Sequence, residues 1–82
     1  MSYLKYNVKT LINDVFTIPS GCQYIKISLQ AGNDMDITIN GILTTLQGGH
    51  QYILPVCNAS VYPAILCDNT PGAHTGLLEW VI

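Results

Sequence analysis

The dipeptide Asn40-Gly41 is the feature that most constrains the fold of this chain. It follows the segment 35–39, in which apolar and polar residues alternate at the period of a strand with one buried face. Both central residues of a type I′ turn need a positive φ, which Gly adopts freely and Asn tolerates. The chain is therefore predicted to turn back at this dipeptide, so that residues 42–46 pair with 35–39 in a hairpin.

The same alternation recurs along the rest of the chain between turn signals such as Pro19, Gly21 and Gly48-Gly49. No window of the sequence has the i, i+3, i+4, i+7 spacing of an amphipathic helix. Pro63 interrupts an apolar segment and predicts either a bulged strand or two half-strands there. Strands are predicted at 2–10, 15–18, 23–30, 35–39, 42–46, 50–56, 61–67 and 77–82.

The alternation also predicts which side of each strand is buried. In the first strand, Leu4, Tyr6 and Val8 form the more apolar side, so the even-numbered side is predicted to face inward. Trp80 shares a side with Leu78 and is predicted to lie in the core.

A chain of 82 residues is expected to form one small domain that buries ~60–65% of the surface of its unfolded state. We predict an all-β fold for residues 1–82: a compact β-sandwich or jelly-roll-like barrel of about eight short antiparallel strands, without substantial helix.

The composition is poor in charge for so small a protein, with 49% hydrophobic and 10% charged residues. So few charges leave apolar surface that other protein must cover, which predicts that the chain forms part of an assembly. The three cations are scattered lysines and the net charge is −2, so no nucleic-acid partner is expected.

No stretch approaches the ~20 apolar residues of a membrane helix, and the N-terminal segment MSYLKYNVK alternates in polarity. Synthesis in a cytoplasm without membrane insertion is the expectation. Cys22, Cys57 and Cys67 cannot all pair within one chain, so reduced thiols are expected.

The residues that carry chemistry are not spaced as in known sites. Three cysteines with His50 and His74 contain no C-x-x-C or H-x-x-x-H pair, which argues against zinc and against an activated thiol. Asp34 and Asp36 flank Met35, a weak calcium pattern that solvated carboxylates also explain. No catalytic, metal-binding or cofactor-binding residue is predicted, and the chain is not expected to be an enzyme.

Some residues are better suited to protein contacts. Tyrosine combines a large apolar area with a polar tip, and two tyrosines lie on strand sides that they share with lysines or polar residues. The predicted interface residues are Tyr3, Lys5, Tyr24, Lys26 and Ile53.

The segments Phe16–Gly21, Tyr24–Ser28 and Ile37–Gly41 give the order apolar-x-Ile-Pro-x-Gly, apolar strand, acidic turn, strand, Asn-Gly. This order resembles small all-β structural proteins of tailed bacteriophages, including head decoration (cement) proteins and fibre or neck modules. The final segment Leu78–Ile82 is similar to the way such proteins end.

The resemblance implies a virion protein, made in the host cytoplasm, that acts as a homo-oligomer, a trimer or larger. It would bind the major capsid protein or other virion proteins and stabilise the capsid. Two alternatives stay open. One is a receptor- or glycan-binding module of a fibre, with exposed tyrosines and the loop residues Asn69, Thr70 and His74. The other is a small inhibitor or regulator that docks on a host protein.

Overall fold

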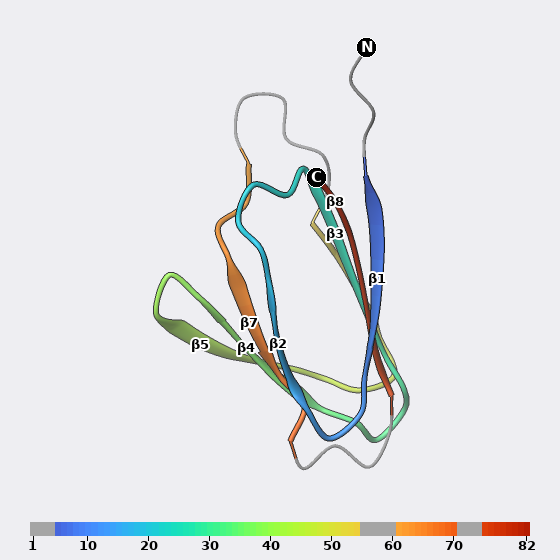
Figure 1. The fold of residues 1–82 in the computed structure, drawn as a ribbon. Coiled ribbons are helices and arrows are strands. Elements are labelled where there is room, and N and C mark those ends of the chain that lie inside the picture. Colours follow the sequence, from blue (N-terminus) through green and yellow to red (C-terminus); the bar gives the residue numbers. More distant parts are fainter. Residues whose placement is uncertain (1–4, 55–60, 71–74) are drawn as a thin grey trace.

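The computed structural model describes residues 5–54, 61–70 and 75–82, which fold as two antiparallel four-stranded sheets packed face to face (Figure 1). The first sheet has the strand order β1-β8-β3-β6, and the second sheet has the order β2-β7-β4-β5. The strands are β1 (Tyr6–Leu11), β2 (Val15–Ile18), β3 (Tyr24–Leu29), β4 (Met35–Ile39), β5 (Ile42–Leu46), β6 (Gln51–Leu54), β7 (Ile65–Asp68) and β8 (Gly76–Val81).

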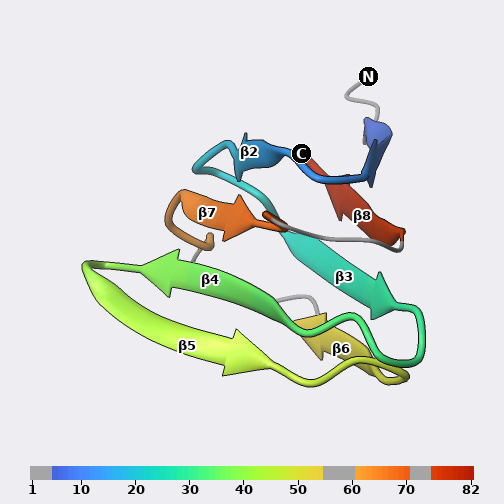
Figure 2. The same cartoon turned by 90° about the horizontal axis from the view of Figure 1, so that it is seen from below.

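The predicted all-β class is confirmed, since the described residues form eight short strands and no helix. Among these strands, only β4 and β5 are neighbours both in sequence and in a sheet. Every other connection crosses from one sheet to the other, so β1 pairs with β8 at the far end of the chain. The sandwich is therefore held together almost entirely by pairings between distant segments (Figure 2).

The predicted hairpin is confirmed. Asn40 and Gly41 have φ values of 53° and 77°, the left-handed conformation that a type I′ turn requires at both positions. The register runs from the pair Ile39 and Ile42 to the pair Met35 and Leu46.

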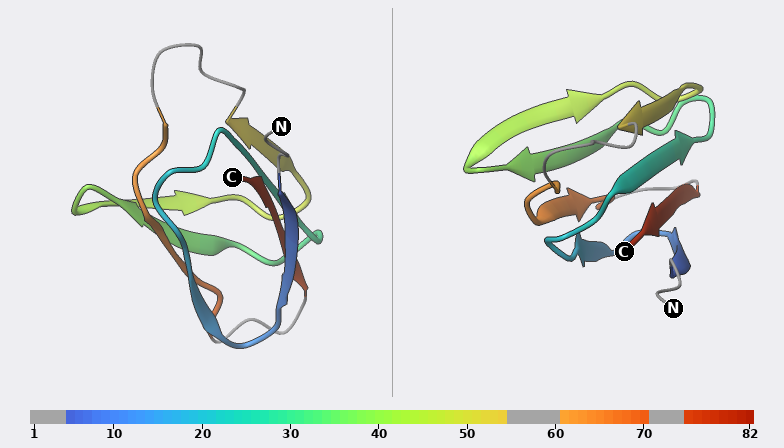
Figure 3. Two further views of the ribbon diagram at one scale, coloured as in Figure 1. Left: turned by 45° about the horizontal axis from the view of Figure 1, so that its top comes forward. Right: turned by 90° about the horizontal axis from the view of Figure 1, so that it is seen from above.

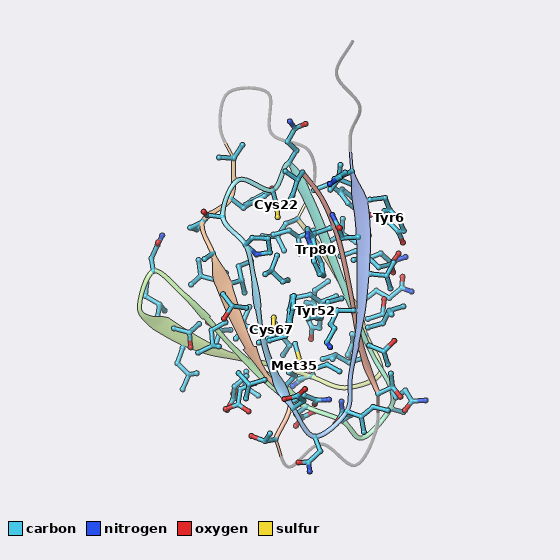
Figure 4. The ribbon with its side chains drawn as sticks, viewed as in Figure 1. Tyr6, Cys22, Met35, Tyr52, Cys67 and Trp80 are labelled. Atoms are coloured by element: carbon cyan, nitrogen blue, oxygen red, sulfur yellow. The ribbon has the colours of Figure 1, made fainter. Side chains whose placement is uncertain are left out.

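The core lies between the sheets and follows the predicted alternation of the central strands. Ile25 and Ile27 of β3 and Leu78 of β8 are completely buried, and Trp80 is confirmed as a core residue with a relative exposure of 6%. The Trp80 ring lies 5.3 Å from that of Phe16 in the opposite sheet, as centroid distance. Figure 4 shows Trp80, Met35 and both described cysteines between the sheets.

The predicted inward side of the first strand was wrong. Tyr6 and Val8 are 60% and 52% exposed, whereas Leu11 is completely buried. The pairing with β8 decides this, because Lys9 stands opposite the buried Leu78 and must share its side of the sheet. The Lys9 ammonium lies 5.7 Å from the centre of the Phe16 ring, so its aliphatic stem covers the core edge while the charge reaches the ring. Leu4 and the rest of residues 1–4 lie outside the described residues.

Of the two arrangements predicted around Pro63, the structure agrees with the divided one and not with a continuous bulged strand. Tyr62 makes an isolated antiparallel bridge with Cys22, and β7 begins only at Ile65. In the strand predicted at 50–56, the described part is β6, while residues 55–60 lie outside the described residues.

A buried pair of amides closes the end of the sandwich where β1, β3 and β7 end. Asn33 and Asn69 are 4% and 1% exposed. The Asn33 Nδ2 donates to Asn69 Oδ1 at 3.0 Å, and the Asn69 Nδ2 donates to the Leu11 carbonyl oxygen at 2.7 Å. Buried amides need such partners, and here the bonds tie the loops after β3 and β7 to each other and to the end of β1.

The turn at Gly41 supplies a direct test of the hairpin. A Cβ at this position would meet no atom within 4 Å, so Gly41→Val acts through backbone strain at positive φ rather than through a clash. We expect a loss of more than about 1 kcal/mol in the free energy of unfolding, measured by urea denaturation. Thr38→Ala, on the outer side of β4, is the control and is expected to change it by less than about 0.5 kcal/mol. Equal stability of Gly41→Val and wild type would contradict the role of this turn.

The buried thiol of Cys67 makes stability depend on pH. Burial raises its pKa from 9.0 to about 12, because the thiolate loses its hydration in the core. The unfolded chain therefore releases this proton above pH 9 while the folded chain keeps it, so stability is lost as pH rises from 9 towards 12. Between about pH 8 and about pH 10, Cys67 is expected to account for a loss of roughly 1 kcal/mol in the free energy of unfolding. Urea denaturation of Cys67→Ala should show a correspondingly smaller loss than wild type; the same pH dependence in both proteins would contradict this assignment.

Candidate interaction surface

The thiols of the described residues are not placed for chemistry. Cys22 and Cys67 are both completely buried and unpaired, and burial raises the pKa of each thiol. His50 is exposed, and its ring lies edge-on to that of Tyr52 with 6.4 Å between the ring centroids. Cys57 and His74 lie outside the described residues. Among the residues described, no group of three or more His, Cys, Asp or Glu side chains is arranged to hold a metal ion.

The two carboxylates considered for calcium serve the fold. Asp34 accepts a hydrogen bond from the Gly48 backbone N–H at 2.8 Å, which joins two loops. Asp36 accepts from the Thr45 hydroxyl at 2.7 Å across the hairpin. Each carboxylate is thus hydrogen-bonded to a different partner, Asp34 in a loop and Asp36 in the β4–β5 hairpin.

A surface suited to binding is the outer face of the first sheet. Since side chains alternate along each strand, the register of the four strands stacks their outward residues in three rows. The upper row is Tyr6, Val81 and Tyr24; the middle row is Val8, Glu79, Lys26 and Ile53; the lower row is Thr10, Leu77, Ser28 and Gln51.

This outer face is mainly apolar and balanced in charge. Tyr6, Val8 and Ile53 are more than half exposed, and Tyr24, Val81 and Leu77 are half-buried beside them. Among the described residues of this face, the charged ones are Glu79 and Lys26, which stand opposite each other in the β3–β8 register.

A tyrosine is fixed by the central carboxylate of this face. The Tyr6 hydroxyl donates a hydrogen bond to the Glu79 Oε2. This bond, together with the nearby negative charge, raises the pKa of Tyr6 above its ordinary value of 10.0, because it favours the neutral phenol. The Tyr6 ring is therefore held against the sheet with its apolar area exposed, pointing away from the core in Figure 4.

The structure brings together three of the five predicted interface residues. Tyr24, Lys26 and Ile53 lie on this face, on neighbouring strands. Lys5 is exposed and immediately precedes β1. Because side chains alternate, Lys5 points to the same side as Lys9 and away from the side of Tyr6. Tyr3 lies outside the described residues.

Sequence reasoning missed Tyr6 and Val8 on this face, because the parity of the first strand was assigned the wrong way. Leu11, an apolar residue just beyond the predicted strand, was the signal that could have corrected this. It is buried, and the other odd-numbered residues of β1 point to the same side. The loop residues named for glycan binding are placed differently: Asn69 is buried, Thr70 is exposed and His74 lies outside the described residues. Asn69 therefore does not offer its side chain to a ligand.

Comparisons with known proteins do not assign this surface. No protein-family model matches the chain, and neither a curated protein nor a solved structure matches it. In the part of the chain that the structure describes, no helix has the length and apolar character needed to cross a membrane.

Proposed function

We propose that this protein is a non-enzymatic structural protein that docks the outer face of its first sheet on a virion capsid and stabilises it as a decoration, or cement, protein. The observation that carries the proposal is the mainly apolar, charge-balanced surface around Tyr6, Val8 and Ile53. The choice of a virion as the partner depends on the resemblance of the sequence to small all-β phage proteins.

The chemistry of this face suits contact with protein. Exposed aliphatic and tyrosine side chains gain free energy when a partner removes them from water. Glu79 and Lys26 stand opposite each other in the β3–β8 register, so this face carries no net charge that a partner would have to neutralise. A contact of about 800 Å² per partner is typical of specific complexes, and repeated copies on one particle add many such contacts.

A capsid also gives a reason for the charge-poor composition. A decoration protein works in a permanent assembly, where its apolar surface is covered by neighbours. Several copies acting together at the seams between coat subunits make the shell more resistant to internal pressure, although each contact is modest.

The test is co-sedimentation with particles purified from cells that express this chain from its native locus. We expect wild type to sediment with the particles at a fixed copy number per capsid. The double variant Val8→Glu and Ile53→Glu, which places two carboxylates on the docking face, should lose at least about tenfold in particle binding. The matched control is Val15→Glu, on an exposed position of β2 in the second sheet, and it should bind as wild type does.

Each variant must retain the β-sheet circular dichroism of the wild type. Absence of wild-type protein from the particles would contradict the proposed function. Equal binding of the double variant and the control would contradict the assignment of the docking face.

A further inference from the structure

The second sheet ends in a strand whose free edge carries none of the usual protection. β5 lies at the end of the order β2-β7-β4-β5 and pairs with β4 alone among the described strands (Figure 3). Its sequence, ILTTL, contains no charged residue and no proline. Unprotected edges of this kind pair readily with another strand, and proteins usually block them.

The other three edge strands differ. β1 carries Lys9, β2 has only four residues, and β6 also has four residues and is followed by Pro55. Lysines, short length and proline are the common means of preventing edge pairing. The edge of β5 is thus the exception in this sandwich.

β5 also exposes apolar side chains on both of its sides. Ile42 is 69% exposed and Leu43 is 65% exposed. In Figure 1 the hairpin of β4 and β5 projects beyond the rest of the second sheet, so the first sheet does not cover Ile42. Leu46, at the other end of the same strand, is 8% exposed and belongs to the core.

We propose that β5 pairs antiparallel with β5 of a second copy of this chain, about a two-fold axis at Thr44, and joins the two second sheets into one continuous sheet. This assignment goes beyond the proposed function and does not rest on it. A trimer or larger cluster would have to use a different surface.

The backbone N–H and C=O groups of β5 point in the directions that this pairing requires. The two-residue loop makes Ile39 and Ile42 exchange backbone hydrogen bonds, so Thr44 also directs its backbone groups towards β4. Leu43 and Thr45 then direct theirs to the free edge. With the axis at Thr44, Leu43 of one copy faces Thr45 of the other, and each pair exchanges both backbone hydrogen bonds.

The side chains of ILTTL are self-complementary in that register. Ile42 comes opposite Leu46 of the second copy, which places an apolar neighbour beside the uncovered tip of the hairpin. Thr44 faces Thr44 of the second copy, a favourable cross-strand pair, and no like charges meet. Since one short strand buries less than the ~1,600 Å² of a standard interface, the dimer is expected to dissociate at roughly micromolar concentrations.

Sedimentation across a range of concentrations tests this proposal. Wild type should show a monomer–dimer equilibrium, and Thr44→Lys should raise its dissociation constant at least about tenfold by opposing two ammonium groups. The matched control is Thr17→Lys, the same substitution at an exposed position of β2, the opposite edge strand. It should leave the equilibrium unchanged. Mixing Thr44→Lys with Thr44→Glu should restore dimers.

An engineered disulfide tests the position of the two-fold axis independently. Facing residues of a non-hydrogen-bonded pair have Cα atoms about 4.5 Å apart, within the range that a disulfide spans. In a Cys57→Ser background, Thr44→Cys should form a cross-linked dimer on oxidation, and Thr17→Cys should not. A wild type that stays monomeric, or a dimer that neither responds to Thr44→Lys nor cross-links through Thr44→Cys, would overturn the proposal.

Discussion

A sandwich of two small sheets covers only one side of each strand, and only where the two sheets overlap. This constraint governs the rest of the structure. The chain has apolar residues on both sides of several strands: Leu77 beside the buried Leu78 in β8, and Ile53 beside the half-buried Leu54 in β6. The apolar residues on one side of each strand fill the core, and those on the other side remain on the surface. The exposed apolar area is therefore built into the sequence pattern and is not an accident of loose packing.

The two proposed contacts use different parts of this exposed apolar surface. The outer face of the first sheet offers side chains, with Tyr6 fixed by Glu79 at its centre. The edge of β5 offers backbone hydrogen bonds together with the exposed Ile42 and Leu43. Because these surfaces belong to different sheets, one copy can pair with another while its outer face stays available to a larger partner.

Local turn chemistry and strict alternation made much of the fold predictable. The hairpin at Asn40-Gly41 and the burial of Trp80 follow from short-range patterns, and both were confirmed. The parity of β1 does not follow from such patterns, because it is set by pairing with β8 at the other end of the chain. Its more polar side contains Lys9, whose ammonium lies over the Phe16 ring, so hydrophobicity alone pointed to the wrong side.

The candidate surface was predictable to the same extent. Tyr24, Lys26 and Ile53 were identified from their side chains, but their position on one face with Val8 depends on the strand order. The exposed edge of β5 depends on it too. A sequence shows that a strand forms, whereas its place at the end of a sheet comes from long-range pairings that the local pattern does not encode.

In the proposed dimer, the free edge of β5 is covered by a second copy of the chain. Amide hydrogen exchange at single residues measures this directly, because the N–H groups of Leu43 and Thr45 face the free edge while that of Thr44 faces β4. Exchange at Leu43 and Thr45 is expected to slow as protein concentration rises through the micromolar range, while Thr44 is protected throughout. Rapid exchange at Leu43 and Thr45 at every concentration would contradict it.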